Sequence, residues 1–134
     1  MAKPIKTKNL KQGTMFKASP HEVYEMLMDS KKHALFSDAS ARISRKVGGK
    51  FTAYDGWITG KNLKLTKDKE IIQSWRSEDW PKGHYSTVKF TLKKDGAGTK
   101  LIFLQTDIPA ADYKDISSGW KEFYWERMKA MIGP

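Results

Sequence analysis

The chain has 134 residues, which is enough for one domain and not comfortably for two. It contains no cysteine, so disulfides, thiolate metal sites and cysteine nucleophiles are excluded. No apolar run approaches the roughly 18 residues that cross a bilayer, and the polar, basic start is not a signal peptide. We therefore expect a cytoplasmic protein that does not bind a membrane.

The formal net charge is +10, because 25 lysine and arginine residues stand against 15 acidic ones. This charge suits a basic surface without a dedicated partner, a surface for an acidic protein, or a surface for nucleic acid. Most of the excess is lysine, and the aromatic residues are not visibly interleaved with arginine as base stacking requires. We therefore expect no nucleic-acid binding, and we expect association with acidic surfaces to weaken as salt rises.

The N-terminal part of the chain predicts a tail, a strand and two short helices. Residues 1–9 are basic with little to bury and predict a flexible tail, so the domain would span 10–134. Leu10–Ala18 predicts the first strand. Ser19 followed by Pro20 is typical of a helix start, and the apolar spacing predicts a helix through Asp29. A second short helical turn is expected over Lys31–Phe36.

From residue 41 to residue 106 the pattern changes to strands separated by turns. Gly48-Gly49 and Asp55-Gly56 mark turns, and the second pair favours a hairpin. Val88, Phe90 and Leu92 alternate with polar residues, as in an antiparallel strand with one wet face. The connections are too short for crossover helices, so the sheet should be antiparallel. The expected strands are Phe51–Tyr54, Trp57–Leu65, Glu70–Ser77, His84–Lys93 and Thr99–Asp107.

The C-terminal segment predicts a long amphipathic helix over Ile116–Ile132, roughly 25 Å in length. Ser117 or Ser118 is the expected N-cap, and Gly133-Pro134 the stop. Such a helix needs a surface that covers its apolar stripe, and the concave face of a twisted sheet supplies one. We therefore predict an α+β fold with six or seven antiparallel strands. The stripe consists of Ile116, Trp120, Phe123, Tyr124, Met128 and Met131.

Five short motifs occur in a specific order and spacing along the chain. They are Gly48-Gly49-Lys50-Phe51, Asp55-Gly56, Trp75-Arg76, Trp80-Pro81 and Gly119-Trp120. With them the chain, from about Leu10 to Gly133, resembles the C-terminal domain of the activators of the ninety-kilodalton heat-shock protein ATPase. That family is related to the START lipid-transfer domains and the birch-pollen allergens.

The resemblance implies a helix-grip fold, in which a curved sheet wraps around the last helix and often leaves an apolar cavity. It also implies a co-chaperone domain that contacts the heat-shock chaperone and modulates its ATPase. In the activators this domain follows a separate N-terminal domain, whereas this chain begins directly with the basic tail. We therefore expect either an excised domain or a stand-alone relative.

The candidate cavity residues lie on the predicted strands and on the last helix, and they can equally be ordinary core. On a helical wheel Arg127 falls inside the apolar stripe, between Phe123 and Trp120. Its guanidinium would either reach water at the sheet edge or pair with a carboxylate of the protein or of an acidic ligand. The candidates are Trp57, Trp75, Val88, Phe90, Trp120, Phe123, Tyr124, Arg127 and Met131.

Candidate partner-binding residues are the cations on the predicted outer surface, namely Lys61, Lys64, Lys67 and Arg76. Arg76 follows Trp75 directly and so should point to the opposite face of its strand. There it would pair with Glu78 or Asp79, face solvent, or contact a partner.

No arrangement of residues predicts catalysis, a metal or a cofactor. His21, His33 and His84 fall in three different segments with no i, i+4 pair, and no serine has the surroundings of a catalytic triad. We expect a monomeric, non-enzymatic co-chaperone domain. The alternative is a carrier for a small hydrophobic or amphipathic acidic ligand held between sheet and helix.

Overall fold

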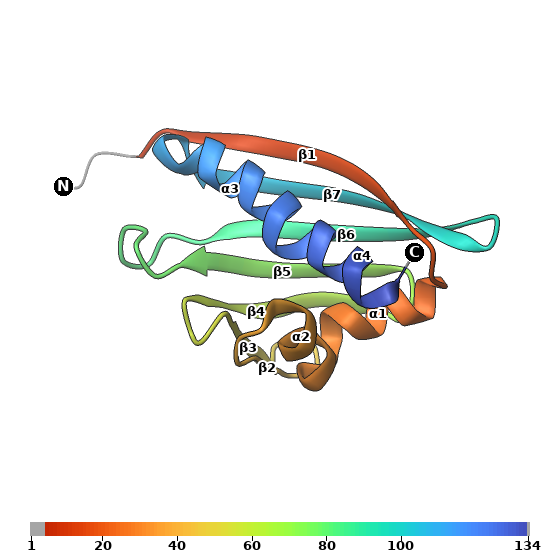
Figure 1. Cartoon of the computed structure of the whole chain (residues 1–134). Coiled ribbons are helices and arrows are strands. Elements are labelled where there is room, and N and C mark those ends of the chain that lie inside the picture. The colour runs from red at the N-terminus through yellow and green to blue at the C-terminus, as the bar shows by residue number, and fades with distance from the viewer. Residues whose placement is uncertain (1–4, 134) are drawn as a thin grey trace.

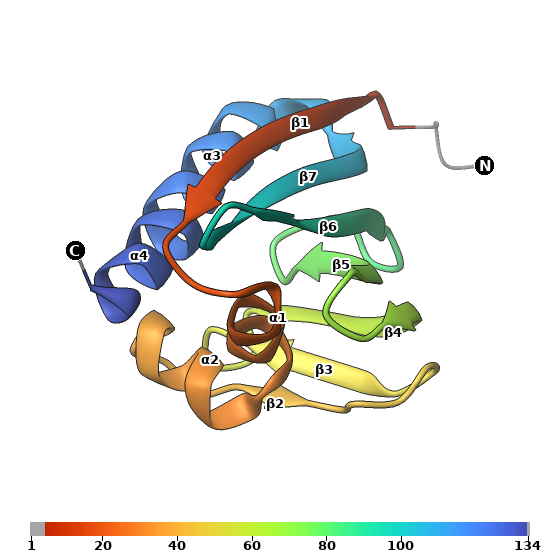
Figure 2. The ribbon, with the colours of Figure 1, turned by 90° about the vertical axis from the view of Figure 1, so that its right-hand side faces the viewer.

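A seven-stranded antiparallel sheet forms one layer of the structure, and the helices cover only one of its faces (Figures 1 and 2). The computed structural model describes residues 5–133. The strand order is β1-β7-β6-β5-β4-β3-β2, so the N-terminal strand lies beside the last strand. The predicted α+β class and the long C-terminal helix against a curved sheet are confirmed.

The sheet consists of β1 (Thr7–Phe16), β2 (Arg42–Ile43), β3 (Lys50–Ala53), β4 (Ile58–Thr66), β5 (Glu70–Ser77), β6 (Ser86–Asp95) and β7 (Gly98–Pro109). The helical segments are α1 (Pro20–Met28), α2 (Ser30–Ser37), η1 (Ala110–Asp112), α3 (Tyr113–Gly119), η2 (Trp120–Trp125) and α4 (Glu126–Ile132). The last four segments follow one another without a break and form one continuous helical arm.

Strand β1 begins at Thr7, three residues before the predicted start at Leu10. Thr7 and Lys8 pair with Pro109 and Ile108 at the end of β7, and a bulge separates Lys8 from Leu10. The predicted boundary between tail and domain is therefore wrong for residues 7–9, while residues 1–4 lie outside the described residues. The side chains of residues 7–9 are polar and exposed, so they show no apolar alternation that would predict a strand. The pairing is made by backbone hydrogen bonds, which the sequence does not display.

Helix α1 begins as the sequence predicts. Ser19 Oγ accepts a hydrogen bond from the backbone N–H of Glu22 at 3.1 Å, and Pro20 occupies the first turn. Asp29 ends α1 and caps α2, since its carboxylate accepts from the Lys32 N–H at 2.9 Å. That backbone hydrogen bond is the main reason why the pKa of Asp29 is lowered.

The C-terminal helical arm begins earlier than predicted, because η1 follows β7 directly at Ala110. Ser117 and Ser118 therefore lie inside α3 and do not cap it, and the predicted N-cap is wrong. Ser118 instead donates its hydroxyl to the Lys114 carbonyl one turn back, at 3.1 Å. The helix reaches Ile132 as predicted, and Gly133 follows with φ of 97°; Pro134 lies outside the described residues.

The middle of this arm is π-helical, which changes the face that it buries. The backbone N–H of Glu126 bonds to the carbonyl of Lys121, five residues back. Trp125 is consequently buried at 4% exposure, although the α-helical wheel left it out of the stripe. Phe123, predicted to pack in the core, is 40% exposed. The wider turn changes the direction of the residues within it, so the wheel at 100° per residue misplaces Phe123 and Trp125. Trp120, Tyr124 and Met128 are buried as predicted.

The core lies between the concave face of the sheet and the helices. Trp120 is at its centre, with its ring centroid 4.3 Å from that of Phe103 and 5.8 Å from that of Phe90. Its indole N–H donates to the side-chain carbonyl of Gln105 at 2.7 Å. Burial of a large aromatic ring with its one polar atom satisfied makes Trp120 the main anchor of the helical arm.

Candidate functional site

A pocket of about 370 Å³ opens between the helical arm and one end of strands β4 and β5. The loop between β3 and β4 supplies one wall, the sheet supplies the floor, and α3 with η2 supplies the other wall. Its lining is mainly aromatic and aliphatic, as is typical of sites for small molecules. The lining residues are Tyr54, Trp57, Ile58, Trp75, Ser77, Asp115, Ile116, Gly119, Trp120, Phe123 and Tyr124.

Part of the predicted cavity set lies at this pocket. Val88 and Phe90 lie outside it, because β6 runs beneath the helix where side chains fill the space; they are 0% and 3% exposed. Met131 also lies outside it, 40% exposed near the end of α4. The six lining residues that were not predicted as cavity residues include Tyr54 and Asp115, for which no local signal exists. The predicted residues that do line the pocket are Trp57, Trp75, Trp120, Phe123 and Tyr124.

Arg127 is not among the residues that line the pocket, and no carboxylate of the described residues pairs with it. Its Nη1 donates to the backbone carbonyl of Ser37 at 2.9 Å, and its guanidinium lies 5.2 Å from the centre of the Phe123 ring. Ser37 is the last residue of α2, where helix carbonyls lack partners and attract positive charge. Arg127 therefore fastens α4 to α2, and the reason to expect an acidic ligand disappears.

Among the tryptophans that line the pocket, Trp75 carries a buried indole N–H that has no partner among the described residues. Its Nε1 is buried without a hydrogen bond, whereas Trp120 Nε1 donates to Gln105 and Trp125 Nε1 donates to Gln12, each at 2.7 Å. A buried donor left unpaired is uncommon and costs stability. A molecule in the pocket that offers an acceptor to Trp75 would remove that cost.

Neutral polar groups lie in the pocket wall, as Tyr54 and Tyr124, and behind it, as His33. His33 Nε2 is 3.0 Å from the Tyr124 hydroxyl, and burial lowers the pKa of His33 to about 4. Burial also raises the pKa of Tyr54 to about 12 and that of Tyr124 well above its ordinary value. The Tyr54 hydroxyl donates to the backbone carbonyl of Phe123 in the π-helical segment. These groups are uncharged near neutral pH, so Asp115 is the charged residue of the pocket lining.

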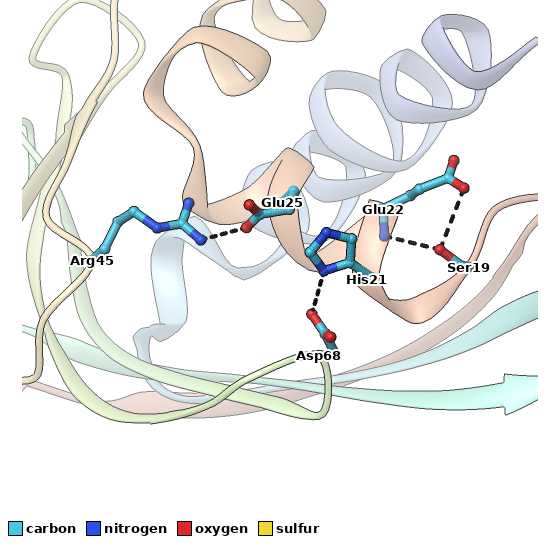
Figure 3. Close-up of polar contacts among 6 residues, drawn as sticks. All are labelled: Ser19, His21, Glu22, Glu25, Arg45 and Asp68. Atoms are coloured by element: carbon cyan, nitrogen blue, oxygen red, sulfur yellow. Dashed lines mark hydrogen bonds and ion pairs between the residues drawn. The ribbon is translucent and has the colours of Figure 1, made fainter.

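Figure 3 shows a polar cluster at α1 that contains serine, histidine and aspartate. Ser19 Oγ is engaged by Glu22, through its backbone N–H and its carboxylate, while His21 Nδ1 lies 2.9 Å from Asp68 Oδ1. This geometry is a helix cap beside a histidine–aspartate contact, and it lacks the serine–histidine contact of a nucleophilic site. Within residues 5–133 no three His, Asp or Glu side chains gather as a metal site would require.

The same cluster attaches α1 to the sheet. Glu25 pairs with Arg45, which follows β2, while His21 reaches Asp68 in the turn between β4 and β5.

Among the described helices none is long and apolar enough to cross a membrane.

The convex face of the sheet, opposite the helices, carries the predicted partner-binding lysines. Lys61 and Lys64 are exposed on β4, and Lys67 is exposed in the following turn. Lys64 Nζ lies 2.9 Å from the carboxylate of Glu70, and Lys89 Nζ lies 3.5 Å from it. The hydrogen bond from Lys64 is the main cause of the lowered pKa of Glu70.

Arg76 lies on this convex face, opposite the buried Trp75, as the strand alternation predicts. The predicted pairing with Glu78 or Asp79 is wrong. Its Nη2 donates to the carbonyls of Trp80 and Pro81, at 2.8 and 3.4 Å, because the loop after β5 folds back over it. The partly buried Arg76 therefore holds that loop in place. Its guanidinium is less accessible to a partner than the ammonium groups of the exposed lysines.

Comparison with known proteins identifies relatives of this fold. A relative from Dictyostelium discoideum, named activator of 90 kDa heat shock protein ATPase homolog, is 34% identical over 92% of this chain and 32% of its own length. The human activator of 90 kDa heat shock protein ATPase homolog 1 is 31% identical over 88% of this chain and 35% of its own. The crystal structure of an HSP90 activator from Plasmodium falciparum superposes with a TM-score of 0.89 at 24% identity, covering 93% of this chain and 96% of that one.

The chain spans about a third of the length of the curated relatives that it matches. Residues 17–133 match the family described as activator of Hsp90 ATPase homolog 1-like protein, which is nearly the whole of the described domain. The chain belongs to the activator of Hsp90 ATPase homolog 1-like family.

Proposed function

We propose that this domain is a non-catalytic co-chaperone module that binds the ninety-kilodalton heat-shock chaperone and modulates its ATPase. Family membership carries the proposal, because the relatives from Dictyostelium discoideum and human are named as activators of that ATPase. A bound module changes the ATPase only through its different affinities for the conformations of the chaperone. The binding surface must therefore favour one conformation over the others.

The exposed lysines support docking on an acidic surface. The chain has a formal net charge of +10, and Lys61, Lys64 and Lys67 lie together on and beside the convex face of the sheet. Charges of this kind mainly raise the association rate and its dependence on salt.

An ATPase and binding assay with the full chain tests this function. The chain is added to the chaperone at two salt concentrations, and affinity should fall as salt rises past ~0.15 M, where the Debye length is ~8 Å. Changing Lys61, Lys64 and Lys67 to glutamate should slow association more than it speeds dissociation. The matched control changes Lys114, Lys121 and Lys129, which are exposed on the helical arm. Salt-independent binding, or no binding by calorimetry, would contradict the proposal.

A second candidate function is the binding of a small apolar molecule, favoured by the unpaired indole N–H of Trp75 at the pocket. Because Asp115 is the charged lining residue and Arg127 is engaged by Ser37, we propose a neutral ligand with a hydrogen-bond acceptor. The ligand's apolar body would contact Trp57, Phe123 and their neighbours.

Dodecanol, dodecylamine and dodecanoate share one tail and differ in their head group, so they test the charge preference. We expect dodecanol, whose hydroxyl can accept from the Trp75 N–H, to shift the Trp75 indole resonance in ¹H–¹⁵N NMR spectra, and dodecanoate to bind more weakly. Dodecylamine, a cation without an acceptor at neutral pH, should not make this hydrogen bond and serves as the control for charge. Gly119→Leu should fill the pocket and abolish the shift, since the added Cβ of Gly119 meets only Phe123, at 3.9 Å. A Trp75 resonance that no head group moves, or tighter binding of dodecanoate, would refute this candidate.

A further inference from the structure

A row of five side chains crosses the convex face of the sheet from β1 to β4. Strand pairing places Lys11 beside Leu104, Leu104 beside Lys89, Lys89 beside Ile72, and Ile72 beside Lys64. Cationic and aliphatic residues therefore alternate strand by strand. The sequence alone does not show this order, because the five residues come from five different strands.

The row is accessible in the described structure. Figure 2 shows α1, α2 and the helical arm on the opposite side of the sheet. Leu104 is 37% exposed, and the side chains of Lys89 and Lys64 are 45% and 62% exposed. Met15 on the neighbouring edge of the same face is 47% exposed. Aliphatic side chains held at the surface between lysines are available for a partner with both apolar and acidic groups.

From this row we infer a docking surface for an acidic amphipathic helix of a protein partner, lying across the strands. Neighbouring strands are about 4.8 Å apart, so the three lysines follow one another at about 10 Å. Residues seven apart on a helix are separated by about 10.5 Å, with an intermediate position of the same face about 5 Å along. Carboxylates at i, i+7 and i+14 thus meet Lys11, Lys89 and Lys64, and aliphatic residues between them meet Leu104 and Ile72.

The spacing distinguishes a helix from an extended chain. Same-face residues of a strand repeat at about 6.7 Å, which matches neither the distance between strands nor twice that distance. Nucleic acid fits less well, because the row contains lysines and aliphatic side chains with no aromatic ring on which a base could stack. The flexible stems of the lysines allow the outer two to follow the curvature of the sheet.

Glu70 competes with the partner's carboxylates for Lys64 and Lys89. It lies 2.9 Å from Lys64 Nζ and 3.5 Å from Lys89 Nζ, so two of the three cations share one carboxylate. An acidic helix must draw these lysines away from Glu70 or share them with it. Removal of the Glu70 charge should therefore strengthen binding at this row. Binding at a surface elsewhere on the domain should not be strengthened by that change.

Two synthetic peptides of equal composition test the surface with the full chain. Both are alanine-rich helices of about 19 residues, which include the stretch from i to i+14 that spans the row and about two residues at each end, with matched helicity checked by circular dichroism. The first carries Glu at i, i+7 and i+14 with Leu between them, and the second carries the same residues out of register. We expect the first peptide to bind about fivefold more tightly and to shift the amide resonances of Lys11, Lys89 and Lys64.

Three variants locate the binding. Lys89→Gln should weaken the first peptide about two- to fivefold, and Glu70→Gln should tighten it by a similar factor. Lys121→Gln, which removes the same charge from the exposed side of η2, should leave the affinity unchanged. Equal binding of the two peptides, no effect of Glu70→Gln, or an equally tight twenty-nucleotide oligothymidylate would overturn the inference.

In naming a protein partner this inference rests on the proposed function, and titration of the chaperone separates the two. If the chaperone binds the chain but is indifferent to Lys89→Gln and Glu70→Gln, the docking surface is wrong and the co-chaperone function stands. If the chaperone does not bind at all, the proposed function fails, and the peptide pair alone decides whether the sheet face takes an acidic helix.

Discussion

Trp120 and Trp125 are five residues apart, yet their rings stack with centroids 5.6 Å apart and an interplanar angle of 23°. An α-helix places residues five apart on different sides, whereas the π-helical turn between Trp120 and Trp125 brings them to one face. Each indole N–H is then satisfied by a glutamine, Gln105 of β7 for Trp120 and Gln12 of β1 for Trp125. The π-helical turn thus places two large aromatic side chains against β1 and β7, the first and last strands along the chain.

Trp120→Ala should lower the free energy of unfolding by about 3–5 kcal/mol, because a ring that is 3% exposed is removed and a cavity remains. Phe123→Ala is the matched control on the same turn; its ring is 40% exposed, so the loss should be about 1 kcal/mol or less. Chemical denaturation measures both. A Trp120→Ala midpoint close to that of the wild type would refute the packing described for the helical arm.

Acid should destabilise the domain through His33. Its pKa is about 4 in the folded protein and 6.5 when unfolded, because burial disfavours the charged ring. Above pH 6.5 both states are neutral and His33 has no effect; between pH 6.5 and 4 the unfolded state binds the proton, so stability falls. The total loss is about 3 kcal/mol.

His33→Gln tests this titration because glutamine keeps a polar partner for Tyr124 but does not ionise. Denaturation midpoints measured from pH 7.5 to 4.5 should fall more steeply for the wild type than for the variant. Parallel curves would show that His33 does not contribute to the acid sensitivity.

Two glycines should respond in opposite ways to alanine. Gly119 lies in the helical arm with room for a Cβ, so Gly119→Ala should stabilise by about 0.5–1 kcal/mol through helix propensity. A Cβ on Gly60 would lie 1.8 Å from the Ser74 carbonyl oxygen and 2.7 Å from the Phe51 ring. Gly60→Ala should therefore destabilise by more than about 2 kcal/mol. Thermal unfolding of both variants checks the contrast, and equal shifts would contradict it.

Arg127→Met should loosen the end of α2 and leave the pocket intact. The variant loses the hydrogen bond from the guanidinium to the Ser37 carbonyl, at a cost of about 1–2 kcal/mol. Hydrogen exchange should accelerate in α2 and remain unchanged in β7. Lost binding of the neutral probe without faster exchange in α2 would instead assign Arg127 to the pocket.

Local signals in the sequence were sufficient for most elements of the fold. Strand β5 has the predicted bounds Glu70–Ser77, and Ser19 caps α1 as predicted. Alternation along one strand and hydrogen bonds within one helical turn depend on neighbouring residues, so they are visible in the sequence. The motifs that indicated the family also lie within single segments, which explains why the fold and family could be identified from them.

Only the tertiary structure decided which side chains meet. Trp125 is buried and Phe123 exposed because of the π-helical turn. The turn lets Trp125 reach Gln12, 113 residues away, while Trp120 reaches Gln105, 15 residues away. Arg127 donates to the backbone carbonyl of Ser37, the last residue of another helix, and does not line the pocket. The row from Lys11 to Lys64 exists because strand register aligns five separate strands. Such contacts join distant segments, and the energy of each depends on the packing and pairing of the whole sheet, which no local pattern contains.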